Sequence, residues 1–297
     1  MIAPITNYEN LFNKLVKKTS EYLTTNNLKC MVLGISGGID STVVAAICHE
    51  VSKKTGIPLI GRSLPTKYNK KGETTTADLV GKAFCNDFQT FYIGDMYENV
   101  LDELIETSEN QTPIANGNIQ ARLRMIYLYN LASIHRGLVM DTDNLTENNL
   151  GYFTIHGDVG DFNPIGCLWK TEVFKLAEWL FHHYEKSDYP QLAKAVRASL
   201  QLKPTAGLGI TDSDLDELGA ESYEQVDAIL QEIKAWEWLV AKRFDTFDSL
   251  QDMCNRFLEE QQMLDVPTNI IVNVARRHFN SEFKRNQLPI KITRNEI

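Results

Sequence analysis

The stretch LGISGGIDS, residues 33–41, joins an apolar segment to the start of a helical pattern. Backbone N–H groups converge where a glycine-rich turn opens a helix, and the helix N-terminus adds partial positive charge. Gly37 and Gly38 can adopt positive φ and let a phosphate approach the backbone, while Ser36 and Ser41 add hydroxyl donors. A plain strand-to-helix turn is the simpler alternative, but the full set of residues favours a phosphate site.

Asp40 lies inside this turn. An acid beside a phosphate is repulsive unless a cation lies between them, so Asp40 implies Mg²⁺. The turn is not GxGxxG and the chain has no GxxxxGK[ST]. These absences argue against a Rossmann dinucleotide site and the usual NTPase P-loop.

Strand and helix patterns alternate along most of the chain. Apolar runs predict strands over 30–35, 57–65, 88–94 and 137–142. Helical periodicity predicts helices over 7–26, 41–54, 74–85, 95–107, 115–136 and 170–184. The alternation predicts an α/β fold: a parallel twisted sheet with helices on both faces, Rossmann-like in outline. Further helical patterns at 223–280 and a basic tail at 275–291 predict a helical C-terminal appendage.

Polar residues follow several of the predicted strands. Thr142 and Glu147 follow the strand at 137–141, as Asp40 follows the first strand and Pro65 and Thr66 follow the second. In a parallel α/β sheet these groups gather at the carboxyl edge, where ligands bind. Glu147 can then join Asp40 at Mg²⁺, and Thr142 can meet a nucleotide.

The glycine-rich stretch resembles the SGGxDS loop of the ATP pyrophosphatases, which cleave ATP between its α and β phosphates. Later stretches resemble ammonia-dependent NAD synthetase within that group. They are GNIQARLRM (117–125), TDNLTE (142–147), GYFTIHGD (151–158), PIGCLWKTEV (164–173), KPTAGL (203–208), TDSDLDELG (211–219), SYEQVD (222–227) and SEFKR (281–285). They keep the family's order and cover most of residues 7–290, so the resemblance implies the ATP-pyrophosphatase type of fold.

The resemblance implies a role for each matching residue. For ATP binding it indicates Gly34, Ile35, Ser36, Gly37, Gly38, Ile39, Asp40, Ser41, Thr142, Lys170 and Thr205. For the dinucleotide substrate it indicates Asn118, Arg122, Asp161, Glu217, Phe283 and Lys284. Asp40 and Glu147 are the expected Mg²⁺ ligands, and Ser36, Lys170 and Asp158 are the candidate catalytic residues.

Two of these residues also carry an argument from helix geometry. Asn118 and Arg122 are four apart and share a helix face, whereas Arg124 points to nearly the opposite side. Only one of the two arginines can readily serve a site, and for Arg122 a structural salt bridge is the alternative. Lys170 opens a helix, where a lysine opposes the dipole, so contact with a triphosphate would explain it.

The sequence departs from the family pattern in three places. Ile155 replaces a family lysine, Gly207 replaces the aspartate of PTAD, and residues 181–200 are longer than usual. The first change removes a positive charge expected near the substrate. A relative that uses nicotinate mononucleotide in place of the dinucleotide therefore stays open.

The implied reaction has two steps. The nicotinate carboxylate of deamido-NAD attacks the α-phosphate of ATP, and ammonia then attacks the acyl-adenylate and displaces AMP. Asp158 is the candidate base for ammonia, and residues 204–219 are the expected lid. No glutaminase of the nitrilase type is visible, so ammonia is free or comes from a separate protein. Family resemblance also implies a homodimer.

Two rival interpretations have a different chemistry. Another adenylating enzyme of the same group, such as a tRNA thiolase, would carry catalytic cysteines and a basic face, and neither is visible. A nucleotide sensor without chemistry would not need both Asp40 and Glu147.

Composition limits the partners and the compartment. The net charge of −9 over 297 residues argues against a duplex nucleic-acid partner. No signal-like segment or apolar run near 18 residues occurs, so we expect neither secretion nor membrane insertion. Five scattered cysteines without a CxxC pair fit the reducing cytoplasm. We expect one domain over 1–297, with a core at 1–202 and a lid loop, helices and tail at 203–297.

Overall fold

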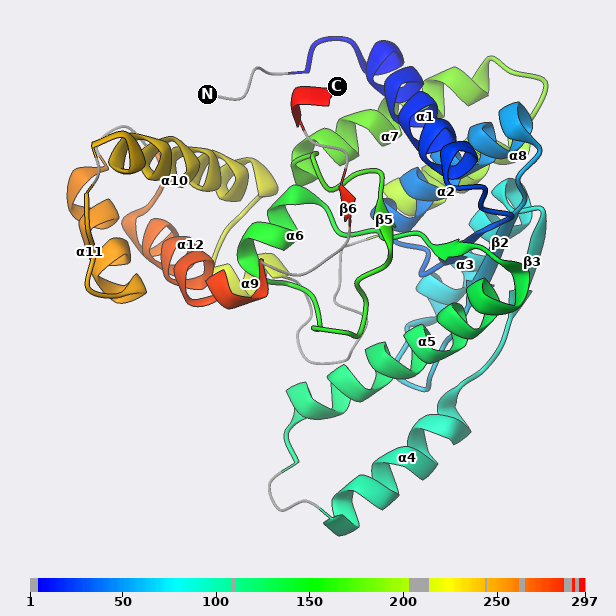
Figure 1. Cartoon of the computed structure of the whole chain (residues 1–297), viewed down its shortest axis with the longest axis horizontal. Helices are drawn as coiled ribbons and strands as arrows, with labels where there is room; N and C mark the ends of the chain where they lie inside the picture. The colour runs from blue at the N-terminus through cyan, green and yellow to red at the C-terminus, as the bar shows by residue number, and fades with distance from the viewer. Residues whose placement is uncertain are drawn as a thin grey trace.

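A parallel sheet lies at the centre of the larger part of the molecule (Figure 1). The computed structural model describes residues 5–107, 111–202, 214–243, 245–261, 265–285, 290–291 and 294–296. Within them the strands of this sheet are β1 (Met31–Gly34), β2 (Leu59–Ser63), β3 (Asp87–Thr90) and β4 (Leu138–Val139). Their order is β3-β2-β1-β4 and all are parallel, which confirms the predicted sheet.

Helices cover both faces of the sheet. One face carries α1 (Tyr8–Thr25), α2 (Ile39–Thr55), α3 (Lys71–Phe84), α7 (Lys170–Glu185) and α8 (Pro190–Leu200). The other face carries α4 (Gly94–Thr107) and α5 (Pro113–His135), which Figure 1 shows on the side away from α1 and α2. Successive residues of a strand point to opposite faces. Accordingly Met31 and Leu33 pack under the first group of helices, whereas Val32 packs under α4 and α5.

Local sequence signals set the ends of several helices. The side chain of Asn7 accepts a hydrogen bond from the backbone N–H of Asn10 and caps α1. Thr112 caps α5 in the same way through the N–H of Ala115, and Pro113 occupies the first helical position. Both helices begin within two residues of the predicted starts.

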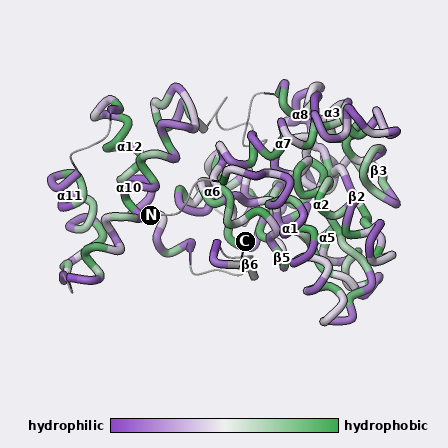
Figure 2. The backbone as a smooth tube through the Cα atoms, turned by 90° about the horizontal axis from the view of Figure 1, so that it is seen from above, coloured by the Kyte–Doolittle hydropathy of each residue, from purple (hydrophilic) through white to green (hydrophobic). Residues whose placement is uncertain are grey.

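A second hydrophobic core lies in the C-terminal part of the chain. It is formed by α10 (Tyr223–Arg243), α11 (Leu250–Glu260) and α12 (Thr268–Asn280), with α9 (Asp214–Leu218) and α6 (Leu145–Leu150) at its edge. The rings of Trp236, Phe257 and Phe279 meet at its centre. Seen from above, this group lies beside the sheet and its helices, with α6 between the two parts (Figure 2). The helical appendage predicted at 223–280 is therefore present.

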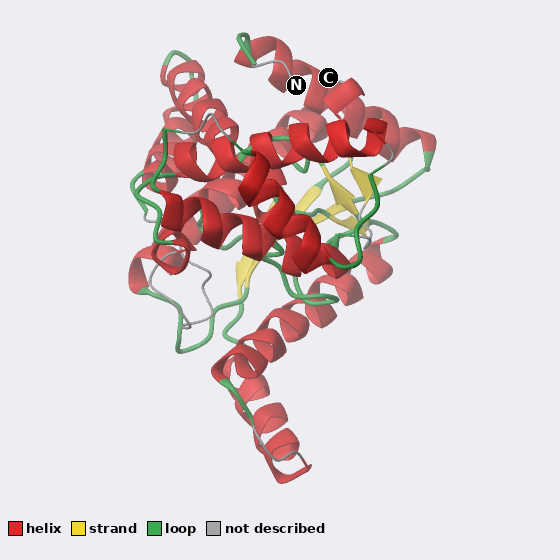
Figure 3. Ribbon diagram, turned by 90° about the vertical axis from the view of Figure 1, so that its left-hand side faces the viewer, coloured by secondary structure: helices red, strands yellow, loops and turns green. Residues whose placement is uncertain are grey.

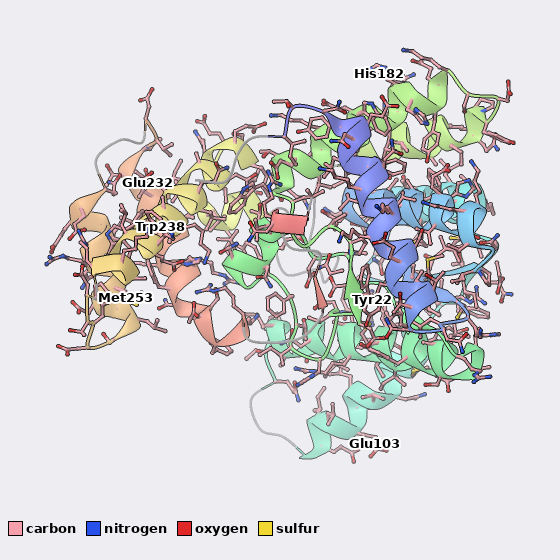
Figure 4. All side chains as sticks on the ribbon, turned by 45° about the horizontal axis from the view of Figure 1, so that its top comes forward. Tyr22, Glu103, His182, Glu232, Trp238 and Met253 are labelled. Carbon is pink, nitrogen blue, oxygen red and sulfur yellow. The ribbon has the colours of Figure 1, made fainter. Side chains whose placement is uncertain are left out.

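Figure 4 also shows the C-terminal helices apart from the sheet and the helices that cover it. Figure 4 places Trp238 of α10 and Met253 of α11 in the C-terminal part, away from Tyr22 of α1. Figure 3 shows the strands enclosed by helices and the pair α4–α5 extending from the rest. Among the described residues, none of the helices combines the length and apolar character that a membrane crossing requires.

Some elements were not predicted. They are α6, α8, α9 and a small parallel pair, β5 (Phe162–Asn163) with β6 (Ile290–Lys291). For α6 a signal existed, because Asn144 and Glu147 form a capping box three residues apart. Residues 204–213 of the predicted lid lie outside the described residues, and residues 214–218 form α9.

The turn between β1 and α2 depends on one glycine. Gly37 has φ of 87°, and a Cβ at this position would lie 2.5 Å from the carbonyl oxygen of Glu73 and 2.8 Å from the amide nitrogen of Ala77. The expectation of positive φ holds for Gly37 but not for Gly38. Gly38 has an extended conformation with φ of −67° because it is the N-cap of α2. The turn thus lies directly against α3.

We expect Gly37→Ala to lower the free energy of unfolding more than Gly56→Ala does. Gly56 has φ of 75° but no atom within 4 Å of a built Cβ, so it isolates the backbone cost. That cost is about 1–2 kcal/mol for an L-residue in the left-handed region. At Gly37 overpacking adds about 1–3 kcal/mol. Urea unfolding of both variants measures the difference, and equal losses would contradict the close approach to α3.

Candidate active site

A cavity of about 460 Å³ opens where β1, β2 and β4 end. Strand ends supply part of its wall through Gly34, Ile35, Leu64, Pro65 and Met140. Helix α5, the segment 151–158 and residues from the C-terminal part complete it. The order of strands changes direction between β1 and β4, and parallel α/β sheets bind ligands at that position.

The turn at 36–41 lies at one end of the cavity and is held in shape by hydrogen bonds among its own residues. The Ser36 hydroxyl lies 3.0 Å from that of Ser41 and accepts a hydrogen bond from the Gly38 N–H at 3.1 Å. Ser41 donates to the Gly38 carbonyl at 3.1 Å. Helix α2 begins at Ile39 and is 17 residues long, so its N-terminal partial charge faces an incoming anion.

Three charged side chains meet beside this turn. The Nζ atom of Lys170 lies 2.6 Å from Asp40 Oδ2 and 2.8 Å from Glu147 Oε1. The side chains of Asp40 and Glu147 are 16% and 18% exposed, and that of Lys170 is 3% exposed. Asn144 donates to the other Asp40 oxygen at 2.9 Å. We call Asp40, Glu147 and Lys170 the charge cluster; its formal charge is −1 when all three are ionised.

Electrostatics in the cluster favour the ionised lysine. Burial lowers the pKa of Lys170, but the two carboxylates outweigh that effect and hold it well above its ordinary value. Burial, together with the charge of Asp40, raises the pKa of Glu147 to about 7, although Lys170 opposes the shift. A lysine in the first turn of α7 opposes the helix dipole, and the two acids compensate for this.

Asp158 lies at another part of the cavity wall. Its carboxylate accepts a hydrogen bond from the Thr154 N–H at 2.6 Å, and the Thr154 hydroxyl donates to Asn118 at 2.7 Å. The protein around the cavity raises the pKa of Asp158 to about 6 through burial, against the opposing effects of Thr154, Lys284 and Arg124. A carboxylate of this kind is mostly ionised at neutral pH and can accept a proton.

Lys284 reaches the same region from the C-terminal end of the chain. Its Nζ donates to the carbonyl oxygens of Gly151 at 2.8 Å and Phe153 at 2.6 Å. Burial and the nearby Arg277 lower its pKa from the ordinary value. Lys284 thus fixes the backbone of the segment that carries Asp158 and presents a cation to the cavity.

The two arginines of the GNIQARLRM stretch lie in different surroundings. Arg124 lines the cavity and donates to the Leu64 carbonyl at 3.0 Å and to Asn69 at 3.2 Å. Arg122 is exposed, is not part of the cavity wall, and donates to the Ile155 carbonyl at 3.3 Å. The sequence argument that only one arginine faces the site agrees with this geometry, but the arginine at the cavity is Arg124.

Of the remaining predicted site residues that the structure describes, some line the cavity and some do not. Thr142 and Glu217 line the cavity, and Glu217 pairs with Arg277 at 3.0 Å. Asp161 and Phe283 do not line it. Asp161 accepts hydrogen bonds from the Val139 N–H and the Tyr129 hydroxyl, and Phe283 is 63% exposed. Thr205 and Gly207 lie outside the described residues.

Two further arginines at the cavity were not predicted. Arg62, at the end of β2, is 5% exposed and pairs with Asp87 at 2.7 Å. Arg277 of α12 lies over the ring of Tyr152 at 4.4 Å. A charged residue within an apolar strand was the available signal for Arg62, whereas nothing local distinguished Arg277 from the other basic residues near the C-terminus.

The donor set of the charge cluster suits Mg²⁺. Among the described residues no group of three or more acidic, histidine or cysteine side chains could hold a metal on its own. Mg²⁺, however, is usually bound by one or two carboxylates together with water and substrate phosphates. Asp40 and Glu147 supply two carboxylates at the cavity wall beside the 36–41 turn, and the excess negative charge favours a cation there.

Comparison with known proteins identifies the family of this chain. The family model described as NAD synthase matches residues 11–288. An NH(3)-dependent NAD(+) synthetase from Campylobacter jejuni is 32% identical over 242 residues, covering 81% of this chain and 89% of the relative. One from Finegoldia magna is 36% identical over 226 residues, covering 75% and 85%. The solved structure of NMN synthetase from Francisella tularensis gives a TM-score of 0.71 at 27% identity, covering 96% of this chain and 99% of that one. The chain therefore belongs to the NAD synthase family.

Proposed function

We propose that this chain is a ligase that amidates deamido-NAD to NAD with ammonia and ATP. Support comes from the family and from the names of its relatives. The observation that carries the proposal is the charge cluster beside the 36–41 turn, in one cavity with Asp158 and Lys284. An anion site, two acids for a cation and a separate carboxylate base are what adenylation followed by amidation requires.

In the first step the substrate carboxylate attacks the α-phosphorus of ATP. A C–O–P bond forms, the bond to the β-phosphate breaks, and pyrophosphate leaves. The N–H groups and hydroxyls of the 36–41 turn hold the phosphates, and Lys170 is close enough to the turn to stabilise the growing negative charge. Asp40 and Glu147 would hold Mg²⁺, which neutralises charge on the phosphate oxygens when it is bound.

In the second step ammonia attacks the activated carbonyl carbon. The C–N bond forms, AMP leaves, and one proton must be removed from nitrogen. We assign that proton to the Asp158 carboxylate, which the Thr154 N–H orients. Lys284 and the Phe153 backbone enclose the same part of the cavity, which limits hydrolysis of the adenylate. The ammonia is free or supplied by a separate protein.

Amidation of nicotinate mononucleotide is a second candidate function. The structure of an NMN synthetase has the higher TM-score, 0.71, against 0.65 for an NH3-dependent NAD synthetase from Campylobacter jejuni. Ile155 also stands where the NAD synthetase pattern has a lysine, and in this chain its carbonyl accepts from Arg122. The sequence similarity of the curated relatives still favours the dinucleotide.

We also propose that the chain acts as a homodimer through α4 and α5. Helix α5 exposes Ile126, Tyr129 and Ile134, and α4 exposes Leu104 and Ile105. Such an apolar surface on a helical pair that extends from the rest (Figure 3) is suited to a second copy. Each chain would act as one unit, with residues 203–297 completing the core at 1–202.

Turnover of two pyridine substrates tests the proposal. Purified protein is incubated with ATP, Mg²⁺ and ammonium chloride, with deamido-NAD in one reaction and nicotinate mononucleotide in another. We expect AMP and NAD from the first, at a kcat/KM above that of the second. Faster turnover of the mononucleotide would establish the second candidate function, and AMP from neither reaction would reject both.

The pH dependence of turnover tests Asp158. At a fixed concentration of NH3, we expect kcat to fall as pH decreases through about 6, because protonation removes the base. Asp158→Asn should lower kcat about 10²–10⁴-fold and change the shape of this acidic limb. Asp188→Asn, an exposed site, is the control and should keep the wild-type profile. An unchanged limb in Asp158→Asn would assign the base to another group.

Removal of the central cation tests the charge cluster. Lys170→Met leaves two partly buried carboxylates without their partner, so we expect a loss of about 3–5 kcal/mol in the free energy of unfolding together with loss of turnover. The triple variant Asp40→Asn, Glu147→Gln, Lys170→Met should recover much of that stability without activity. Chemical unfolding measures both, and a Lys170→Met protein as stable as wild type would contradict the ion pairs.

A further inference from the structure

Helix α10 directs two buried side chains at the first turn of α7. Tyr223 and Asp227 are four residues apart and share one helix face. Their exposed fractions are 8% and 2%. The Tyr223 ring lies 5.5 Å from Nζ of Lys170, so α10 reaches the charge cluster from the C-terminal part of the chain.

The two carboxylate oxygens of Asp227 accept hydrogen bonds from two different elements. Oδ1 accepts from the Thr146 hydroxyl of α6 at 2.5 Å, and Oδ2 accepts from the Thr171 backbone N–H of α7 at 3.0 Å. Thr146 precedes Glu147, and Thr171 follows Lys170. One oxygen of Asp227 therefore holds the residue before Glu147, and the other holds the residue after Lys170.

Only a carboxylate satisfies both donors. The Thr146 oxygen already accepts the backbone N–H of Lys170 at 2.8 Å, so its own proton is donated to Asp227. The Thr171 N–H in the first turn of α7 has no intrahelical acceptor and needs one from outside the helix. An asparagine at 227 would offer one good acceptor and place an NH2 group against the second donor. The negative charge also complements the N-terminus of α7.

We propose that Asp227 is a positioning residue that fixes Lys170 and Glu147 relative to each other, although it touches neither substrate nor reacting atoms. Through it, the C-terminal helices take part in shaping the phosphate end of the cavity. This inference rests on the proposed function for its activity readout. Its structural readout is independent of that function.

The test compares Asp227→Asn with two controls on the same helix. Glu224→Gln removes the same charge from an exposed site, and Val240→Ala weakens the C-terminal core without touching α6 or α7 hydrogen bonds. We expect Asp227→Asn to lower kcat/KM for ATP about 10–100-fold, a loss typical of residues that orient metal ligands. Glu224→Gln and Val240→Ala should stay within about twofold of wild type below their melting temperatures.

Thr146→Val provides a second route to the same result. This change removes the hydroxyl that links Asp227 to the Lys170 N–H, but the Thr171 N–H can still donate to Asp227. We therefore expect Thr146→Val also to lower kcat/KM for ATP. Combined with Asp227→Asn it should add little, because both changes break one network. If the losses in kcat/KM were additive, Asp227 would be a purely structural residue. The same conclusion would follow if Val240→Ala lowered kcat/KM and the melting temperature as much as Asp227→Asn does.

Hydrogen exchange supplies the readout that does not need turnover. In ligand-free protein we expect peptides covering 145–150 and 169–173 to exchange faster in Asp227→Asn than in Val240→Ala. Unchanged exchange there would overturn the proposal. If wild-type protein forms no amide from either pyridine substrate, the proposed function fails, while exchange still decides the role of Asp227.

Discussion

One ammonium group between two carboxylates holds the active site together. Lys170 opens α7, Asp40 lies in the first turn of α2, and Glu147 lies in α6. These helices come from three separate stretches of the chain, and the 2.6 and 2.8 Å contacts bring them to one point. Without the lysine, two acids would face each other at the cavity wall with no cation between them. Under the proposed function, Lys170 offsets part of the negative charge that a bound polyphosphate would meet there.

The rest of the site extends from this point along the sheet edge. The 36–41 turn provides fixed N–H and hydroxyl donors, and its closeness to α3 leaves no room for a side chain at Gly37. At the other part of the wall, backbone groups hold Asp158 and Lys284 in place. The proposed function therefore assigns phosphate chemistry and proton transfer to separate parts of the cavity wall.

Much of this geometry was predictable because it depends on local sequence and one topological rule. The alternation of strands and helices predicts a parallel sheet, and the carboxyl-edge rule then places Asp40, Thr142 and Glu147 together. Helix geometry separated Arg122 from Arg124 but did not say which faces inward. That choice depends on how α5 packs against the sheet, and α5 buries residues on more than one side.

Contacts between residues far apart in the chain could not be predicted from the sequence. Nothing near Asp227 indicates that its partners lie 81 and 56 residues away, and nothing near Arg277 indicates its place over Tyr152. Such contacts exist only after two cores have formed and met. The capping box of α6 is different, since Asn144 and Glu147 stand three apart in the sequence and a local search would have found it.

The segment that ends α6 is tied to residues 278–285, which lie 129 to 136 residues further along the chain than their partners. The Asn149 carbonyl accepts bonds from His278 and Arg285, and Lys284 holds Gly151 and Phe153. During synthesis the chain emerges from its N-terminus, so the 36–41 turn is available long before those partners exist. A nascent or truncated chain thus carries the phosphate turn without a closed wall. The cavity wall at residues 149–153 can therefore close only after residues 278–285 have been made, so the two halves of this site are assembled at different times.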